Sequence, residues 1–111
     1  MKIAIIGSRN VVPKEIENYI HDGDEIVSGG AKGVDRYAAE FAKKQGLKLT
    51  EFLPRYDIYG RGAPIVRNYK IVDYCDEVIA FWDGTSKGTR SVIEYAKKTG
   101  KPCRIILCST E

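Results

Sequence analysis

The fold is decided by the stretch Glu25-Ile26-Val27-Ser28-Gly29-Gly30-Ala31-Lys32-Gly33-Val34-Asp35. It opens with a short apolar run, typical of a buried strand. From Val34 onward, apolar residues recur with the spacing of one helical face, at Val34, Tyr37, Ala38, Phe41 and Ala42. The glycines between the two segments let the backbone turn sharply and approach a bulky partner. Because a helix N-terminus directs unpaired N–H groups outward, the pattern predicts an anion, most simply a phosphate, in front of this loop.

Strands and helices alternate along the rest of the chain. Apolar runs predict further strands at Ile3–Ile6, Leu47–Leu53, Val78–Trp82 and Arg104–Cys108, of which the more polar Leu47–Leu53 suits a sheet edge. Amphipathic segments predict a helix from Pro13 that buries Ile16, Tyr19 and Ile20, a helix over Ile65–Tyr74 that buries Ile65, Val66, Tyr69 and Val72, and a helix ending at Gly100 that buries Val92, Ile93 and Ala96. This order predicts an α/β fold, a Rossmann-like three-layer sandwich with a parallel sheet of about five strands, in one domain over residues 1–111.

Four unusual loops each follow a predicted strand. They are Gly7–Asn10, Ser28–Gly33, Pro54–Pro64 and Asp83–Thr89. The carboxyl ends of parallel strands meet at one edge of a sheet, where such folds bind their ligands. The spacing therefore predicts one composite site.

Composition limits the class of protein. The 111 residues carry a net charge of +3, with 43% hydrophobic and 30% charged residues, which is typical of an ordered globular domain. The chain has three cysteines without a CxxC pair and one histidine, His21, so we expect reduced thiols and no metal site. The sequence has no signal-peptide pattern and no run of membrane-spanning length, which predicts a cytoplasmic protein without a membrane partner.

The Asp83–Thr89 loop resembles Ser28–Gly33, because it too contains glycines and precedes the N-terminus of a predicted helix. Thr85, Ser86 and Thr89 can donate hydrogen bonds to phosphate oxygens, and Lys87 supplies positive charge. Each loop has a simpler interpretation, a ligand-free turn for Ser28–Gly33 and an N-capped helix start here. Neither loop fits the strict dinucleotide or Walker pattern. Two such loops on one sheet edge favour an anion site.

Charged and aromatic side chains cluster around these loops. Arg9, Lys32 and Arg67 are the stronger candidates for ligand contact, since most other cations are solvated surface charge. Tyr56 and Tyr59 suit either base stacking or packing. Three carboxylates could carry acid–base chemistry, namely Asp35, Asp83 and Glu94, but a carboxylate near a helix N-terminus is more often a cap.

Four motifs in order resemble the SLOG superfamily over essentially the whole chain. They are Gly7-Ser8-Arg9, Ser28–Asp35, Val66-Arg67-Asn68 and Asp83–Thr89. The chain looks most like the small YspA/YpsA-related branch, and the superfamily includes the DNA-processing protein DprA (Smf) and the LOG phosphoribohydrolases. The resemblance implies a nucleotide-binding Rossmann-like fold, usually in a homo-oligomer. It also implies the ligand-contacting residues Gly7, Ser8, Arg9, Gly29, Gly30, Lys32, Arg67, Gly88 and Thr89, with Asp35 anchoring the first loop.

The LOG enzymes carry a catalytic glutamate in a glycine-rich pattern, and here Val92 occupies the matching position. Glu94 lies about 200° further around a helix and does not substitute for that glutamate. The leading hypothesis is therefore a module that binds a nucleotide or nucleotide-derived small molecule, with a sensor as one such role and with no catalytic residue or cofactor assigned. One alternative is a LOG-like nucleotide N-glycosidase that uses Glu94 or Asp35. A second is DprA-like binding of single-stranded DNA.

Overall fold

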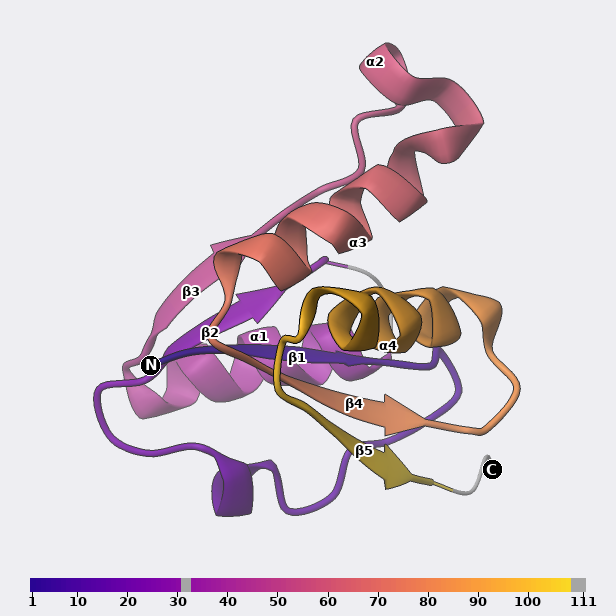
Figure 1. Ribbon diagram of the computed structural model, residues 1–111. Coiled ribbons are helices and arrows are strands. Elements are labelled where there is room, and N and C mark those ends of the chain that lie inside the picture. The colour runs from indigo at the N-terminus through magenta and orange to yellow at the C-terminus, as the bar shows by residue number, and fades with distance from the viewer. Residues whose placement is uncertain (31–32, 109–111) are drawn as a thin grey trace.

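The computed structural model describes residues 1–30 and 33–108 (Figure 1). Its strands form one five-stranded sheet in the order β3-β2-β1-β4-β5, and every neighbouring pair is parallel. The strands are β1 (Lys2–Gly7), β2 (Glu25–Ser28), β3 (Lys48–Glu51), β4 (Glu77–Trp82) and β5 (Cys103–Leu107). The strand order reverses between β1 and β4, which is the place where open α/β sheets bind their ligands. The predicted Rossmann-like α/β fold is confirmed, including β3 at an edge.

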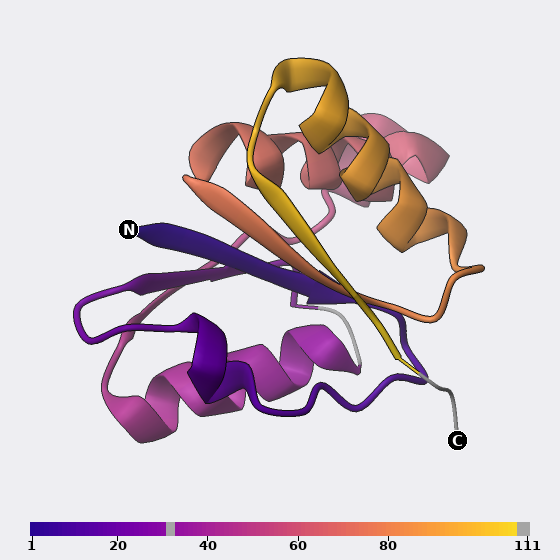
Figure 2. The same cartoon turned by 60° about the horizontal axis from the view of Figure 1, so that its bottom comes forward.

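Helices cover both faces of this sheet, as Figure 2 shows. One face carries α1 and a short 3-10 turn η1, and the other carries α3 and α4. The helical elements are η1 (Ile16–Tyr19), α1 (Val34–Gln45), α2 (Tyr56–Tyr59), the 3-10 turn η2 (Gly60–Gly62), α3 (Ala63–Tyr74) and α4 (Lys87–Thr99). The predicted alternation of strands and helices thus holds along the described chain.

The central strand β1 separates two hydrophobic cores because its side chains alternate between the faces. Ile3 and Ile5 pack in the core under α1, whereas Ala4 and Ile6 pack in the core under α3 and α4. Each of these four side chains is at most 5% exposed. Helices α1 and α4 end at glycines in the left-handed conformation, Gly46 and Gly100, which is the common C-cap geometry of helices.

The helix predicted from Pro13 is wrong in extent. Only the 3-10 turn η1 forms there, because Glu15 adopts φ 59° and its left-handed backbone cannot continue a helix. Ile16 is buried as predicted, while Tyr19 and Ile20 are only half-buried. Tyr37, predicted on the buried face of α1, is 43% exposed.

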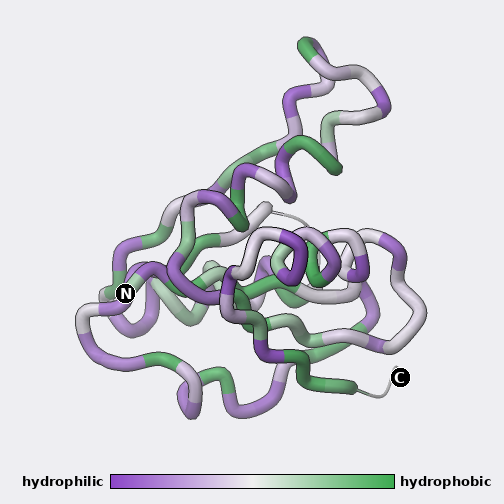
Figure 3. The backbone as a smooth tube through the Cα atoms, in the orientation of Figure 1, coloured by the Kyte–Doolittle hydropathy of each residue, from purple (hydrophilic) through white to green (hydrophobic). Residues whose placement is uncertain are grey.

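The Pro54–Pro64 segment is not simply a loop. It holds α2 and η2, and α3 begins at Ala63 with Pro64 in its first turn, where the missing proline N–H costs no hydrogen bond. This part of the chain projects from the body of the molecule (Figures 1 and 3). The predicted burial of α3 is also partly wrong, because Ile65 and Tyr69 are exposed while Val72 is buried. The helix instead buries the polar Asn68, which lies beside the cavity described in the next section.

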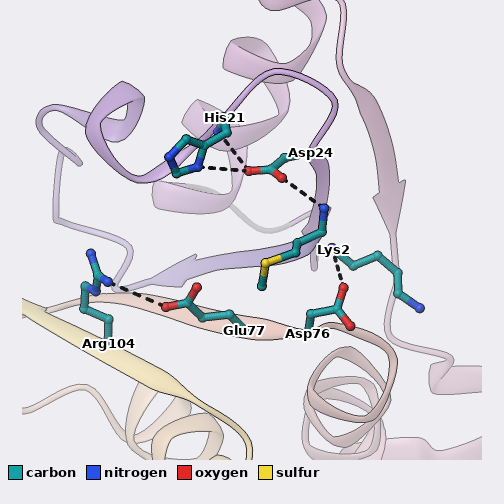
Figure 4. A network of polar contacts seen from close by, with 7 residues as sticks. Lys2, His21, Asp24, Asp76, Glu77 and Arg104 are labelled. Atoms are coloured by element: carbon teal, nitrogen blue, oxygen red, sulfur yellow. Dashed lines mark hydrogen bonds and ion pairs between the residues drawn. The ribbon is translucent and has the colours of Figure 1, made fainter.

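A polar network ties the amino ends of the strands together, opposite the glycine loops (Figure 4). The Met1 amine lies 3.0 Å from Asp24 Oδ1, and the backbone N–H of His21 donates to Asp24 Oδ2 at 2.8 Å. The backbone N–H of Lys2 donates to Asp76 Oδ2 at 2.7 Å. His21 therefore belongs to a structural turn. In the described part of the chain, no cluster of three histidine, cysteine or acidic side chains could hold a metal.

No helix among the described residues is long and apolar enough to cross a membrane.

Candidate ligand-binding site

A cavity of about 460 Å³ opens at the carboxyl ends of β1 and β4, at the switch point in strand order. It lies between the β1 loop, the first turns of α3 and the N-terminus of α4. Its lining residues are Ile6, Gly7, Ser8, Arg9, Asn10, Asp35, Pro64, Arg67, Asn68, Ile71, Asp83, Ser86, Gly88, Thr89 and Val92. The structure thus brings three of the four unusual segments to one hollow, because α3 leads out of the Pro54–Pro64 segment.

The floor of the cavity depends on the contact between the β1 and β4 loops. The Ser8 N–H donates to the Phe81 carbonyl at 3.1 Å, and the Asp83 N–H donates to Ser8 Oγ at 3.3 Å. Gly7 fits only without a side chain, because a Cβ there would lie 2.5 Å from both the Phe81 carbonyl oxygen and Val34 Cγ2. Gly7 therefore lets β1, β4 and α1 meet closely beneath the cavity.

Asp83 shapes the loop that leads into α4. Its Oδ1 accepts hydrogen bonds from the N–H groups of Ser86 at 2.8 Å and Thr85 at 2.9 Å. These two backbone bonds stabilise the ionised carboxylate and lower the pKa of Asp83. Asp83, one of the predicted acid–base candidates, thus acts as a turn-forming acceptor here.

The N-terminus of α4 faces the cavity through Ser86, Gly88 and Thr89. Ser86 is the N-cap residue, and no side chain caps the helix there. The first N–H groups of a helix lack intrahelical partners, and together with the helix dipole they attract anions. Thr89, only 4% exposed, adds a hydroxyl at the same place. This end of the cavity is therefore suited to a negatively charged group.

A chain of hydrogen bonds joins the two glycine loops through α3. Arg67 Nη1 donates to the Gly29 carbonyl at 2.7 Å, and Arg67 Nε donates to Asn68 Oδ1 at 2.9 Å. Asn68 Nδ2 donates to Ser91 Oγ at 3.2 Å, and Ser91 Oγ donates to the Gly88 carbonyl at 2.8 Å. The half-buried Arg67 is thus fixed in orientation at the cavity wall, with the first loop on one side and α4 on the other.

The first glycine loop supports the cavity more than it lines it. Ser28 is fully buried, and its hydroxyl donates to the Asp35 carbonyl at 3.3 Å and accepts from the Gly30 N–H at 3.4 Å. Ser28, Gly29 and Gly30 are not among the lining residues, although Gly29 holds Arg67. Asp35, 6% exposed, does reach the lining from the first turn of α1. Lys32 lies outside the described residues.

Several other predicted residues lie elsewhere. Thr85 and Lys87 are exposed on the α4 loop beside the cavity rather than in its lining. Tyr56 and Tyr59, on α2, are 59% and 41% exposed and also lie outside the lining. Glu94 lines a separate surface groove between α3 and α4. The alternative in which Glu94 acts on a ligand in the cavity therefore finds no support in this arrangement.

Sequence reasoning placed Asn10 and Pro64 only within loops of the composite site, missed Ile6 and Ile71 as lining residues, and gave Asn68 no role of its own. A signal for Asn68 was present, since it directly follows Arg67 in a helix whose other buried positions are mainly apolar. Asn68 is 8% exposed and must find hydrogen-bond partners at that depth, which it does in Arg67 and Ser91.

No protein-family model and no curated protein matches this sequence. Among solved structures, the chain is similar to DNA processing protein A from Helicobacter pylori, a SLOG-family member described for its single-stranded DNA binding mode. The TM-score is 0.75 at 26% sequence identity, and the match covers 95% of this chain and 64% of that one. The chain thus spans just under two thirds of the length of that neighbour.

Proposed function

We propose that this chain binds a nucleotide through its phosphate in the cavity between β1 and β4. The observation that carries the proposal is the position of Arg67. Hydrogen bonds to Gly29 and Asn68 fix this arginine at the cavity wall, and the N-terminus of α4 lines the same cavity. We include in the proposal that the chain belongs to the YspA/YpsA-related branch of the SLOG proteins and acts in the cytoplasm.

The chemistry of the cavity favours phosphate over a neutral ligand. A guanidinium presents N–H groups in a planar fork that matches phosphate oxygens, and the α4 N-terminus adds backbone donors. The volume of about 460 Å³ falls within the usual range for small-molecule sites. Arg9 lies at the exposed end of the lining and would contact the outer part of a ligand.

We propose binding without catalysis. Val92, which lines the cavity, offers no proton-transferring group where the LOG enzymes carry their glutamate. Asp83 is occupied by two backbone donors, and Glu94 lies in the separate groove. Asp35 lines the cavity and is therefore the carboxylate on which the N-glycosidase alternative depends. Incubation with common nucleoside monophosphates followed by chromatography tests this directly. We expect no release of free base, and its release would support the N-glycosidase alternative.

The binding proposal is tested by calorimetric titration of nucleoside mono-, di- and triphosphates. We expect Arg67→Ala to weaken binding at least tenfold, because a charge-assisted hydrogen bond contributes about 1.5–3 kcal/mol. Arg104→Ala is the matched control, because that arginine lies on β5 and pairs with Glu77 away from the cavity. Equal affinity in the two variants would contradict the proposal.

The structural neighbour favours a second candidate function, binding of single-stranded DNA. The projecting α2–η2 segment interleaves aromatic and basic side chains, Tyr56 and Tyr59 with Arg55 and Arg61. Lys70 Nζ lies 5.4 Å from the centre of the Tyr59 ring. Aromatic stacking on bases contributes about 1–3 kcal/mol per base and tolerates any sequence. This segment leads directly into α3, whose Arg67 lines the cavity.

Oligonucleotides distinguish the two candidates. If the ligand is a single strand, affinity measured by fluorescence anisotropy falls steeply with salt, because bound phosphates release counterions. Tyr56→Ala with Tyr59→Ala then weakens oligonucleotide binding by about fivefold or more and leaves a mononucleotide unaffected. Binding of mononucleotides with no measurable affinity for oligonucleotides would exclude this second candidate.

A further inference from the structure

The two edges of the sheet differ in a way that the ligand site does not explain. Edge strand β3 reads Lys48-Leu49-Thr50-Glu51, and its Lys48 side chain is 71% exposed. Such charged, short strands are the usual protection of a sheet edge against pairing. The opposite edge strand, β5, reads Cys103-Arg104-Ile105-Ile106-Leu107 and carries one charged residue, Arg104, among four apolar ones. Figure 3 shows its hydrophobic run continuing to the last described residues.

The side chains of β5 leave apolar surface exposed beside that edge. Ile105 is 37% exposed, and Leu107, at 72%, is the most exposed large hydrophobic side chain among the described residues. Ile105 and Leu107 lie on the same face as Cys103, which packs against the core under α4. On the other face, Ile106 packs against the core under α1.

The hydrogen bonds to β4 identify which backbone groups of β5 point outward. The Val78 N–H donates to the Pro102 carbonyl at 2.9 Å, and the Cys108 N–H donates to the Trp82 carbonyl at 2.8 Å. In a strand, the direction of the backbone groups alternates from residue to residue. Given the register of Val78 with Cys103 and Trp82 with Leu107, the N–H and C=O groups of Cys103, Ile105 and Leu107 face away from β4. These groups have no strand partner in the part of the chain that the structure describes.

We infer that β5 pairs with β5 of a second copy of this chain, antiparallel and about a two-fold axis at Ile105, so that two sheets form one continuous sheet. In this register the two Ile105 residues form a hydrogen-bonded pair, and Cys103 of each copy pairs with Leu107 of the other. All outward-facing residues of both strands are then used, because they are spaced symmetrically about Ile105.

The charge pattern of β5 is compatible with a second copy as the occupant. Arg104 is the only charged residue of β5, and in this register it lies opposite Ile106 rather than the other Arg104. Like charges therefore do not face each other across the pair. Arg104 is also 3.9 Å from Glu77 of its own chain. The exposed Ile105 and Leu107 side chains of both copies meet on one face, where each α4 lies beside the new junction. The strand can thus pair with a copy of itself without placing like charges opposite each other, and its exposed apolar side chains meet on one face.

The assembly is tested by sedimentation velocity on the whole chain and two lysine variants. We expect twice the 12.4 kDa chain mass for the unmodified protein and a single chain mass for Ile105→Lys, which places two lysines opposite each other. Leu53→Lys is the matched control, since Leu53 is 61% exposed beyond the opposite edge and its replacement keeps the dimer. A monomeric unmodified protein, or a dimer that survives Ile105→Lys, overturns the inference.

A crosslink keeps the test decisive if Ile105→Lys fails to fold. In a hydrogen-bonded antiparallel pair the Cα atoms lie about 5.5 Å apart, so the two residues at position 105 lie within the span of a short thiol-reactive crosslinker. We therefore expect Ile105→Cys, with Cys103→Ser and Cys108→Ser, to form a covalent dimer with a short bismaleimide crosslinker. The buried Cys75 remains in place, since it is 1% exposed. Leu53→Cys in the same background is the control. Absence of the Ile105 crosslink, or equal crosslinking at Leu53, contradicts this register.

Discussion

Arg67 Nη1 lies 2.7 Å from the carbonyl oxygen of Gly29, a hydrogen bond that joins α3 to the first glycine loop across 38 residues of sequence. This contact explains why a loop that lies mostly outside the cavity still matters for it. The loop positions the arginine, and the arginine faces the cavity. Gly29 and Arg67 are therefore expected to act together in ligand binding.

Gly29→Ala is expected to weaken nucleotide binding about as much as loss of Arg67 and to cost little stability. A Cβ at Gly29 would lie 2.6 Å from Arg67 Nη1 and 3.0 Å from Asp35 Oδ2. The guanidinium must therefore leave the position in which its hydrogen bonds hold it, and as the end of a flexible side chain it can do so without a shift of the backbone. Titration calorimetry and urea unfolding measure the two effects. Gly62→Ala is the control, because a Cβ there has no neighbour within 4 Å. Undiminished affinity in Gly29→Ala would separate the loop from the site.

Gly7→Ala is expected to destabilise the fold itself. Its Cβ would meet the Phe81 carbonyl and Val34 at 2.5 Å, and overpacking of this kind costs about 1–3 kcal/mol. Gly88→Ala provides the comparison, since its Cβ would meet nothing and alanine is favoured over glycine in a helix by about 1 kcal/mol. Urea unfolding should show opposite shifts for the two variants. A neutral Gly7→Ala would mean that β1, β4 and α1 can separate without cost.

Ser91→Ala is expected to loosen the link between Asn68 and α4. It removes the bond from Asn68 Nδ2 and the bond to the Gly88 carbonyl, for a loss of about 1 kcal/mol of unfolding free energy each at most. Affinity for a nucleotide should also fall, because Arg67 loses its indirect support. Thr99→Ala is the control, since it deletes a hydroxyl-to-carbonyl bond at the far end of α4. A similar loss of affinity in both variants would count against the positioning role.

Stability is expected to fall in acid through Asp24 and Glu25. Burial alone would raise the pKa of Glu25, but hydrogen bonds from Tyr74 at 2.6 Å and Thr50 at 2.7 Å, with Lys48 nearby, outweigh it and lower the pKa. Burial alone would likewise raise the pKa of Asp24, but hydrogen bonds from the His21 N–H and the N-terminal amine outweigh it and lower the pKa.

The sign of the effect follows from these lowered pKa values. Each carboxylate stabilises the fold fully above its ordinary pKa, 3.8 for Asp24 and 4.5 for Glu25, and this contribution is lost as pH falls through the lower folded value. Urea unfolding from pH 7 to pH 3 should show the decline. Glu25→Gln should be less stable at neutral pH and should show a shallower acid dependence. A parallel decline in both proteins would assign the acid sensitivity to other groups.

The fold could be predicted from the sequence because the strands are short apolar runs and the turns between strands and helices contain glycines. Parallel β1 and β4, the C-caps at Gly46 and Gly100, and the edge position of β3 all follow from local pattern. Prediction from the sequence failed where tertiary contact decides, as at Asn68, whose burial depends on the neighbouring α4. The left-handed Glu15 also could not be foreseen, since nothing in its residue type favours that conformation.

The site was predictable as an edge of the sheet but not residue by residue. That several loops meet at the carboxyl ends of the strands follows from topology alone. Which of them line the cavity depends on where α3 passes, and its first turn brings Pro64 and Arg67 inward while α2 carries Tyr56 and Tyr59 away. Glu94 lies in the separate groove because it is about 200° around α4 from Val92, which lines the cavity.

The most direct test of the central claim is a calorimetric titration of a nucleotide panel into the unmodified chain, Arg67→Ala and Arg104→Ala. We predict saturable binding of at least one phosphate-bearing nucleotide by the unmodified chain and by Arg104→Ala, with at least tenfold weaker binding by Arg67→Ala, in line with the value of a charge-assisted hydrogen bond. Binding that is equal in all three proteins, or absent from the unmodified chain for every nucleotide, would contradict the assignment of this cavity as a nucleotide-phosphate site.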